Sequence, residues 1–240
     1  MDFNEFKDKM IDYGRYMDLL FNDKQLKQFY MYMNLILEWN KKINLTAIVE
    51  PDDIIIKHFI DSLTISKYIE KDENLVDVGS GAGFPGIPLK IYRPDIDIIL
   101  VDSLNKRINF LNQVIDDLKL KNICCVHSRI EDFARDKDYR ENFKYVTARA
   151  VANLAVLSEY LIPLAKVKGK CICMKGNEID EEVKNGINAI EILGGKIEEV
   201  DKFNLVNTDI TRNVVIIDKK KNTPIKYPRK AGIPVKEPLN

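Results

Sequence analysis

The stretch Leu75–Pro88, LVDVGSGAGFPGIP, indicates the fold more directly than any other part of the chain. An apolar segment with one carboxylate, Asp77, leads directly into a loop with glycine at every second position, and helix-forming residues follow Pro85. A buried strand, a glycine-rich turn and a helix start in this order are typical of a loop that binds a nucleotide-type cofactor. Glycine lets the backbone approach a ligand closely, and the free N–H groups of a helix start favour a negatively charged group.

The spacing within this loop bears on which cofactor it binds. The G-x-G-x-x-G pattern of nicotinamide-dependent oxidoreductases needs its third glycine at position 84, where this chain has Phe84, and Gly83 comes one residue early. Asp77, two residues before the first glycine, would repel a pyrophosphate and suits a cofactor that carries positive charge. S-adenosylmethionine, with its ammonium and sulfonium, is such a cofactor. The segment favours a methyltransferase, with a dinucleotide enzyme as the alternative.

Length and composition are those of an ordinary globular protein. The chain has 240 residues, 45% of them hydrophobic, and its net charge is zero, which fits one large domain or one domain with an extension. No apolar run reaches the roughly 18 residues of a membrane span, and the N-terminus has no signal-peptide core. We therefore expect a cytoplasmic protein without a membrane partner. With two histidines and no C-x-x-C spacing among four cysteines, we expect free thiols and no metal site.

Residues 1–70 are predicted to form a helical N-terminal extension. Apolar residues recur near helical spacing after Asp23, which could cap that helix, and Pro51 with two following carboxylates resembles another helix start. The Met- and aromatic-rich stripe is interpreted as a packing surface.

Residues 71–218 are predicted to form the main domain, because strand-like and helix-like segments alternate there. Strands are expected at 75–79, 96–101, 122–127, 144–149 and 169–174, and helices near 86–92, 104–119, 153–165 and 178–193. This alternation indicates a mainly parallel sheet with helices on both faces. Two final apolar runs, 196–205 and 212–218, are joined by a segment too short for a helical crossover, so we expect an antiparallel hairpin at the sheet edge. The result is a Rossmann-like α/β fold of the class I methyltransferase type.

Residues 219–240 form a basic C-terminal arm. Seven basic residues and no acidic ones lie between Lys219 and Lys236, and Tyr227 stands among them. Two interpretations remain open. The segment is either a solvated tail or an arm that contacts RNA phosphates and stacks Tyr227 on a base.

Several segments together resemble a known family. They are EWNKKINLTAI, KHFIDSL, LVDVGSGAGFPGIPLKI, VDSLNKRINFLNQV, SRIEDF, TARAVANL and KYPRKAGIP. The chain resembles the small-subunit ribosomal RNA methyltransferase G family, also known as glucose-inhibited division protein B, from about Glu38 to its C-terminus. The resemblance implies a class I fold with a helical extension, S-adenosylmethionine as cofactor, and methylation of guanine N7 in 16S ribosomal RNA. The partner would then be that RNA or the small ribosomal subunit, and we expect a monomer.

The cofactor-binding residues implied by the loop and the resemblance lie at strand ends. The set is Gly79, Gly81, Gly83, Phe84, Asp102, Ile130, Glu131 and Arg149. The glycines would approach the methionine end of the cofactor, and Phe84 would contact it or pack in the core. Asp102 would accept both ribose hydroxyls, or cap the following helix.

The resemblance assigns the adenine contacts to Ile130 and Glu131, for which a helix-start carboxylate is the alternative role. Arg149, at the end of the fourth strand, is the predicted catalytic residue, with a surface ion pair as the alternative. His58 and His127 are interpreted as structural.

Overall fold

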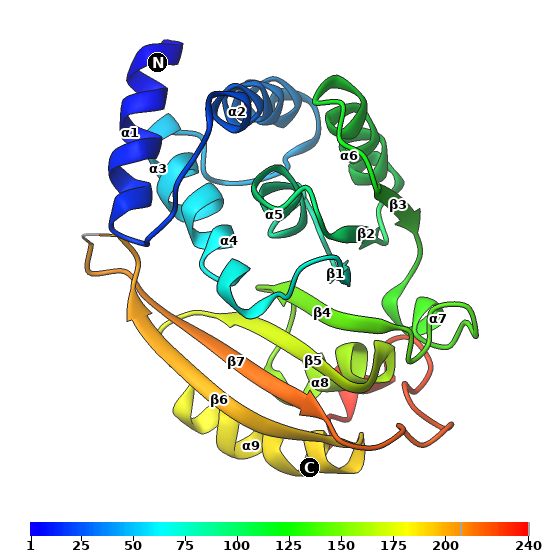
Figure 1. Cartoon of the computed structure of the whole chain (residues 1–240). Coiled ribbons are helices and arrows are strands. Elements are labelled where there is room, and N and C mark those ends of the chain that lie inside the picture. The colour runs from blue at the N-terminus through cyan, green and yellow to red at the C-terminus, as the bar shows by residue number, and fades with distance from the viewer. Residues whose placement is uncertain (207, 240) are drawn as a thin grey trace.

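The computed structural model describes residues 1–206 and 208–239 and contains one seven-stranded sheet with helices on both faces (Figure 1). The strand order is β3-β2-β1-β4-β5-β7-β6. The strands are β1 (Asn74–Val78), β2 (Asp97–Asp102), β3 (Ile123–His127), β4 (Phe143–Arg149), β5 (Ala165–Lys175), β6 (Gly195–Asn204) and β7 (Thr211–Lys219).

The strand directions confirm the predicted topology. The first five strands pair in parallel, and β7 is antiparallel to both β5 and β6. The predicted edge hairpin is therefore present. Asn207 in its connection, and Asn240 at the end of the arm, lie outside the described residues.

The helices of the described residues include the four predicted between 86 and 193, with small shifts, and others, such as those at 130–133 and 233–236, that the sequence did not predict. They are α1 (Phe3–Arg15), α2 (Asp23–Ile43), α3 (Pro51–Ile54), α4 (Asp61–Leu63), α5 (Gly86–Tyr92), α6 (Asn105–Asp117), α7 (Ile130–Phe133), α8 (Leu154–Leu161), α9 (Asp180–Ile192) and α10 (Ile233–Lys236). A π-helical segment, η1 (Ile55–Ile60), joins α3 to α4, and two short 3₁₀ segments are η2 (Ser66–Tyr68) and η3 (Ile162–Leu164).

The cap of α2 differs from the prediction. Asn22, not Asp23, is the capping residue, because its side chain accepts from the Gln25 N–H while the Gln25 side chain bonds back to the Asn22 N–H. This reciprocal pair satisfies two free donors of the helix start, and Asp23 becomes a first-turn carboxylate.

Two cores lie on the two faces of the sheet. Successive strand residues point to opposite faces, so Leu75 packs into the first core and Val76 into the second. The first core is covered by α1 to α6, and the second by α7, α8 and α9 (Figure 1).

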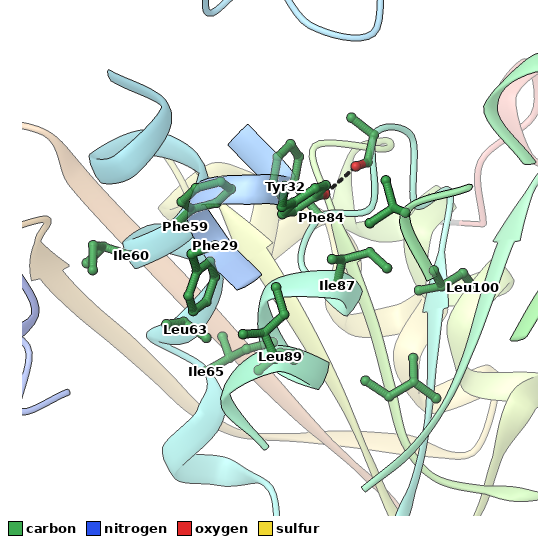
Figure 2. Close-up of a cluster of buried hydrophobic side chains, with 14 of the residues drawn as sticks. Phe29, Tyr32, Phe59, Ile60, Leu63, Ile65, Phe84, Ile87, Leu89 and Leu100 are labelled. Atoms are coloured by element: carbon green, nitrogen blue, oxygen red, sulfur yellow. Dashed lines mark hydrogen bonds between the residues drawn. The ribbon is translucent and has the colours of Figure 1, made fainter. Parts of the chain in front are cut away.

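The N-terminal helices share the first core with the sheet. Phe29 and Phe59 have ring centroids 5.1 Å apart, and they lie in one cluster with Phe84 and Leu100 (Figure 2). The Tyr32 hydroxyl donates to the carbonyl oxygen of Ala82, in the glycine loop, as the dashed line in Figure 2 marks. The N-terminal region therefore packs directly on the glycine loop.

The C-terminal segment is neither a solvated tail nor an arm with a free aromatic ring. Tyr227 is 7% exposed and packs into the second core. Buried Lys219 donates to the Ile162 carbonyl at 2.7 Å and pairs with Glu141 at 2.9 Å. A ring buried in this way cannot stack on a base, so that part of the prediction is wrong.

Candidate functional site

A cavity of about 450 Å³ opens at the carboxyl ends of β1, β2, β3 and β4. In open α/β sheets ligands bind at this edge where the strand order reverses, here between β1 and β4. The lining side chains and backbone belong to Leu45, Thr46, His58, Val78, Gly79, Ser80, Gly81, Ala82, Phe84, Val101, Asp102, Ser103, Arg107, Ser128, Ile130, Arg149, Ala150 and Val151. Of the eight predicted cofactor residues, only Gly83 and Glu131 are not among them.

The glycine loop presents its backbone to this cavity. Gly81 has φ +61°, in the left-handed region that favours glycine, and a Cβ built there would have only the Gly79 oxygen within 4 Å among the residues that the structure describes, at 3.9 Å. The space beside Gly81 is therefore cavity. Gly83 has a packing role instead, because a Cβ there would lie 2.7 Å from the Tyr32 hydroxyl and 2.6 Å from the Ile87 side chain.

Asp102 joins the loop to the end of β2. One carboxylate oxygen accepts from the Gly81 N–H at 2.9 Å, and the other accepts from the Leu104 N–H at 2.9 Å. Arg107 lies 3.3 Å from the first oxygen. Leu104 is the residue before α6. The Asp102 carboxylate therefore fixes the residue that leads into that helix and does not bond an N–H within it.

Asp77 lies behind the loop, outside the cavity lining. It is fully buried, and one carboxylate oxygen accepts from the Gly86 N–H at 2.9 Å. The other oxygen has no partner among the described residues. Burial raises the pKa of Asp77 to about 7.

Arg149 lies in the cavity wall, but most of its donors are used within the protein. Nη1 donates to the Lys57 carbonyl at 3.0 Å and to Asp61 at 3.2 Å, and Nη2 donates to His58 Nδ1 at 3.0 Å. The guanidinium carbon lies 4.7 Å from the centre of the Phe84 ring. Arg149 thus joins β4 to the N-terminal helices, in place of the predicted alternative of a surface ion pair.

His58 lies between Arg149 and the loop that contains Thr46. Its ring stacks on Phe84 with centroids 4.3 Å apart, and its Nε2 lies 2.8 Å from the Thr46 hydroxyl. Burial, and then the Arg149 charge, lower the pKa of His58 to about 3. The ring is therefore neutral and hydrogen-bonded at both nitrogens.

The predicted adenine pair is divided. Ile130 lines the cavity, whereas Glu131 is buried beneath the C-terminal segment and accepts from the Gly232 N–H at 3.1 Å. The carboxylate of Glu131 therefore has a partner inside the protein.

A second cavity of about 440 Å³ lies beside the first and shares His58, Arg149 and Ala150 with it. It opens at the carboxyl end of β5 and the start of β7. Asn213 lines it, is fully buried, and has a side-chain oxygen without a partner among the described residues.

Sequence reasoning missed the contribution of the N-terminal region to the site. Thr46 and His58 line the first cavity, and both lie in segments quoted for the family resemblance, NLTAI and KHFIDSL. That was the available signal, although no local pattern identified either residue. Within residues 1–206 and 208–239, no group of three or more metal-ligating side chains comes together, and no helix is both long and apolar enough to cross a membrane.

Solved structures share this fold at low sequence identity. A SAM-dependent methyltransferase from Aquifex aeolicus aligns with a TM-score of 0.53 at 17% identity, covering 75% of this chain and 97% of that chain. TYW2 from M. jannaschii, solved in complex with AdoMet, aligns with a TM-score of 0.52 at 16% identity over 65% and 72% of the two chains. The fold is that of the class I S-adenosylmethionine-dependent methyltransferases.

Sequence comparison narrows this class to one family. Residues 25–214 match the family described as rRNA small subunit methyltransferase G. Proteins named Ribosomal RNA small subunit methyltransferase G are 56% identical over 224 residues in Clostridium botulinum, covering 92% of this chain and 94% of that protein, and 53% identical over 225 residues in Desulforamulus reducens, covering 93% and 94%. The chain belongs to this family and is a methyltransferase.

Proposed function

We propose that this protein transfers a methyl group from S-adenosylmethionine to N7 of a guanine in 16S ribosomal RNA. The observation that carries this proposal is the pair of adjoining cavities that share Arg149, His58 and Ala150. One cavity lies against the glycine loop and suits the cofactor. The other opens beside it and suits the base that receives the methyl group.

The first cavity fits the chemistry of the cofactor. The open space beside Gly81 accommodates a ligand against the backbone, and Asp102 places a carboxylate where ribose hydroxyls can donate to it. Ile130 and Ser128 supply the wall on the same side for the adenine. When bound, the cofactor supplies a methyl group on a positively charged sulfur.

The chemistry of guanine N7 agrees with the absence of a free base in the shared wall. N7 carries a lone pair at neutral pH, so its attack on the methyl group requires no proton removal. His58 is neutral, and both of its ring nitrogens are occupied. The protein would then act by orientation, which can lower a barrier by roughly 7–11 kcal/mol.

The position of N7 constrains how the RNA binds. N7 faces the deep, narrow major groove of A-form RNA, so the target guanine must lie in a loop or be flipped out into the second cavity. An arginine fork on O6 and N7 would block the reacting atom. Arg149 directs most of its donors into the protein, which leaves N7 free.

We further propose that the protein is a cytoplasmic monomer.

Methyl transfer to RNA tests this function. Ribosomal RNA from cells that lack the protein is incubated with enzyme and cofactor labelled on the methyl group, and the RNA is digested to nucleosides. We expect label in 7-methylguanosine from 16S RNA only. Label in another nucleoside, in protein, or in a small molecule would contradict the proposed acceptor.

A further inference from the structure

We propose that the Thr46 hydroxyl donates a hydrogen bond to the carboxylate of the methionine part of the cofactor. The inference rests on the proposed cofactor. It assigns a ligand contact to the loop before α3, outside the strand-end residues that form the rest of the site. It follows from the direction of the hydrogen bonds around His58.

Arg149 sets the first direction. A guanidinium can only donate, so the contact of 3.0 Å between Arg149 Nη2 and His58 Nδ1 makes Nδ1 an acceptor. A neutral imidazole then carries its hydrogen on Nε2. That hydrogen points along the 2.8 Å contact to the Thr46 hydroxyl oxygen, which must accept it.

Both lone pairs of the Thr46 hydroxyl oxygen then accept hydrogen bonds. It also accepts from the Ile48 N–H at 3.1 Å, and a hydroxyl has two lone pairs. Its own O–H must therefore donate elsewhere. No acceptor for it lies among the described residues, and Thr46 lines the cofactor cavity. The backbone of Thr46 is fixed as well, because its N–H donates to the Asn40 side chain at 2.9 Å.

The cofactor offers one acceptor at this end of the cavity. Asp102, Ser128 and Ile130 form the side that suits the adenosine, so the methionine part lies toward Phe84 and His58. An ammonium and a sulfonium carry positive charge and do not accept a hydrogen bond. The carboxylate accepts strongly, and a hydrogen bond to a charged group is among the stronger kinds.

Calorimetry with two ligands tests the contact. S-adenosylhomocysteine carries the carboxylate, whereas 5′-methylthioadenosine lacks both the carboxylate and the ammonium. Thr46→Val removes the hydroxyl at nearly constant shape. We expect this variant to bind S-adenosylhomocysteine at least about tenfold more weakly than wild type, or by 1.4 kcal/mol. Its affinity for 5′-methylthioadenosine should stay within about twofold of wild type. Thr46→Ser retains the donor and should bind both ligands nearly as wild type does.

A matched control separates this contact from the loss of a hydroxyl in general. Thr147 is fully buried and its hydroxyl donates to the Ile172 carbonyl at 2.8 Å, so Thr147→Val should change both affinities equally. If Thr46→Val does not fold, Thr46→Cys keeps a polar atom beside Ile48 with a much weaker donor, and it should show the same selective loss.

The inference would be overturned by an equal loss of affinity for both ligands in Thr46→Val, by no loss for either ligand, or by a loss in Thr46→Ser as large as in Thr46→Val. Loss of RNA methylation with unchanged S-adenosylhomocysteine affinity would also overturn it, because the hydroxyl would then face the guanine. If the wild-type protein binds neither ligand, the cofactor itself is wrong, which is a distinguishable failure.

Discussion

Arg149 combines a place in the cavity wall with a buried ion pair. Asp61 is 3% exposed and receives hydrogen bonds from Arg149 at 3.2 Å and from Arg212 at 3.0 Å. Burial raises the pKa of Asp61, while both arginines lower it. Arg149 therefore has a structural role besides the catalytic and cofactor-binding roles predicted from the sequence, since the residue ties β4 to η1 and α4.

Removing Arg149 should affect stability as well as activity. Arg149→Ala leaves Asp61 with Arg212 alone and takes the donor from His58, so we expect the free energy of unfolding to fall by about 1–3 kcal/mol. Arg149→Lys keeps the charge without the fork and should lose less stability. Urea unfolding measures both variants. A change below about 0.5 kcal/mol in Arg149→Ala would show that the network contributes little.

The ionisation of His58 provides a second test at this scale. Its pKa falls from 6.5 to about 3, so between these values the unfolded chain binds a proton that the folded chain does not. Falling pH through this window therefore removes stability, by up to about 1.4 kcal/mol per pH unit. Nitrogen-15 NMR of the two histidines, with His127→Gln for assignment, should show His58 neutral and protonated on Nε2 at pH 5. A charged ring at that pH would contradict the hydrogen-bond directions.

Among the elements, the C-terminal segment differs most from its sequence prediction. Arg229, counted as part of an RNA-binding arm, bonds the carboxylate of Glu159, whose side chain is 1% exposed. Lys226 and Lys230 remain exposed. The segment thus contains residues that attach it to α8 and others that are free to meet a phosphate.

These two groups should respond differently to neutralisation. Replacing Lys226 and Lys230 by Gln should make the slope of log affinity for RNA against log salt concentration shallower by about 1.4, if each lysine contacts one phosphate. Thermal stability should not change. Arg229→Gln should instead lower the melting temperature, because Glu159 loses its partner. Binding curves at several salt concentrations measure the slope.

The exposed pair Lys24 and Lys27 on α2 is the matched control, since its neutralisation changes the net charge equally at a distant element. An equal change of slope in both double variants would mean that the segment has no specific role in RNA binding.

For the whole molecule, local patterns predicted the sheet but not what closes the site. The apolar runs and the glycine loop identify strands and a cofactor cavity, because burial and turn geometry act over a few residues. Thr46 and His58 reach the cavity only because the N-terminal helices share a core with α5 and β2 (Figure 2). Their roles depend on packing between segments far apart in sequence.

Packing between distant segments also explains why the prediction for the C-terminal segment was partly wrong. Its basic residues looked available because no acidic residue lies among them from Lys219 to Lys236. Two of their partners are distant in sequence: Glu141 lies just before β4, and Glu159 lies in α8. Glu131 likewise follows a strand end as expected, but the Gly232 N–H that it bonds lies 101 residues away.

Calorimetry of cofactor binding tests most directly whether the glycine-loop cavity is the cofactor site. Wild type and Gly81→Val are titrated with S-adenosylmethionine and with NAD, and melting curves confirm that the variant folds. Among the described residues, the only heavy atom within 4 Å of a Cβ at Gly81 is 3.9 Å away, so the branched side chain should fill space that the ligand needs, besides straining a positive φ. We predict that wild type binds S-adenosylmethionine with no comparable binding of NAD, and that the folded variant binds neither. Tighter binding of NAD by wild type, or undiminished binding of S-adenosylmethionine by Gly81→Val, would contradict the account.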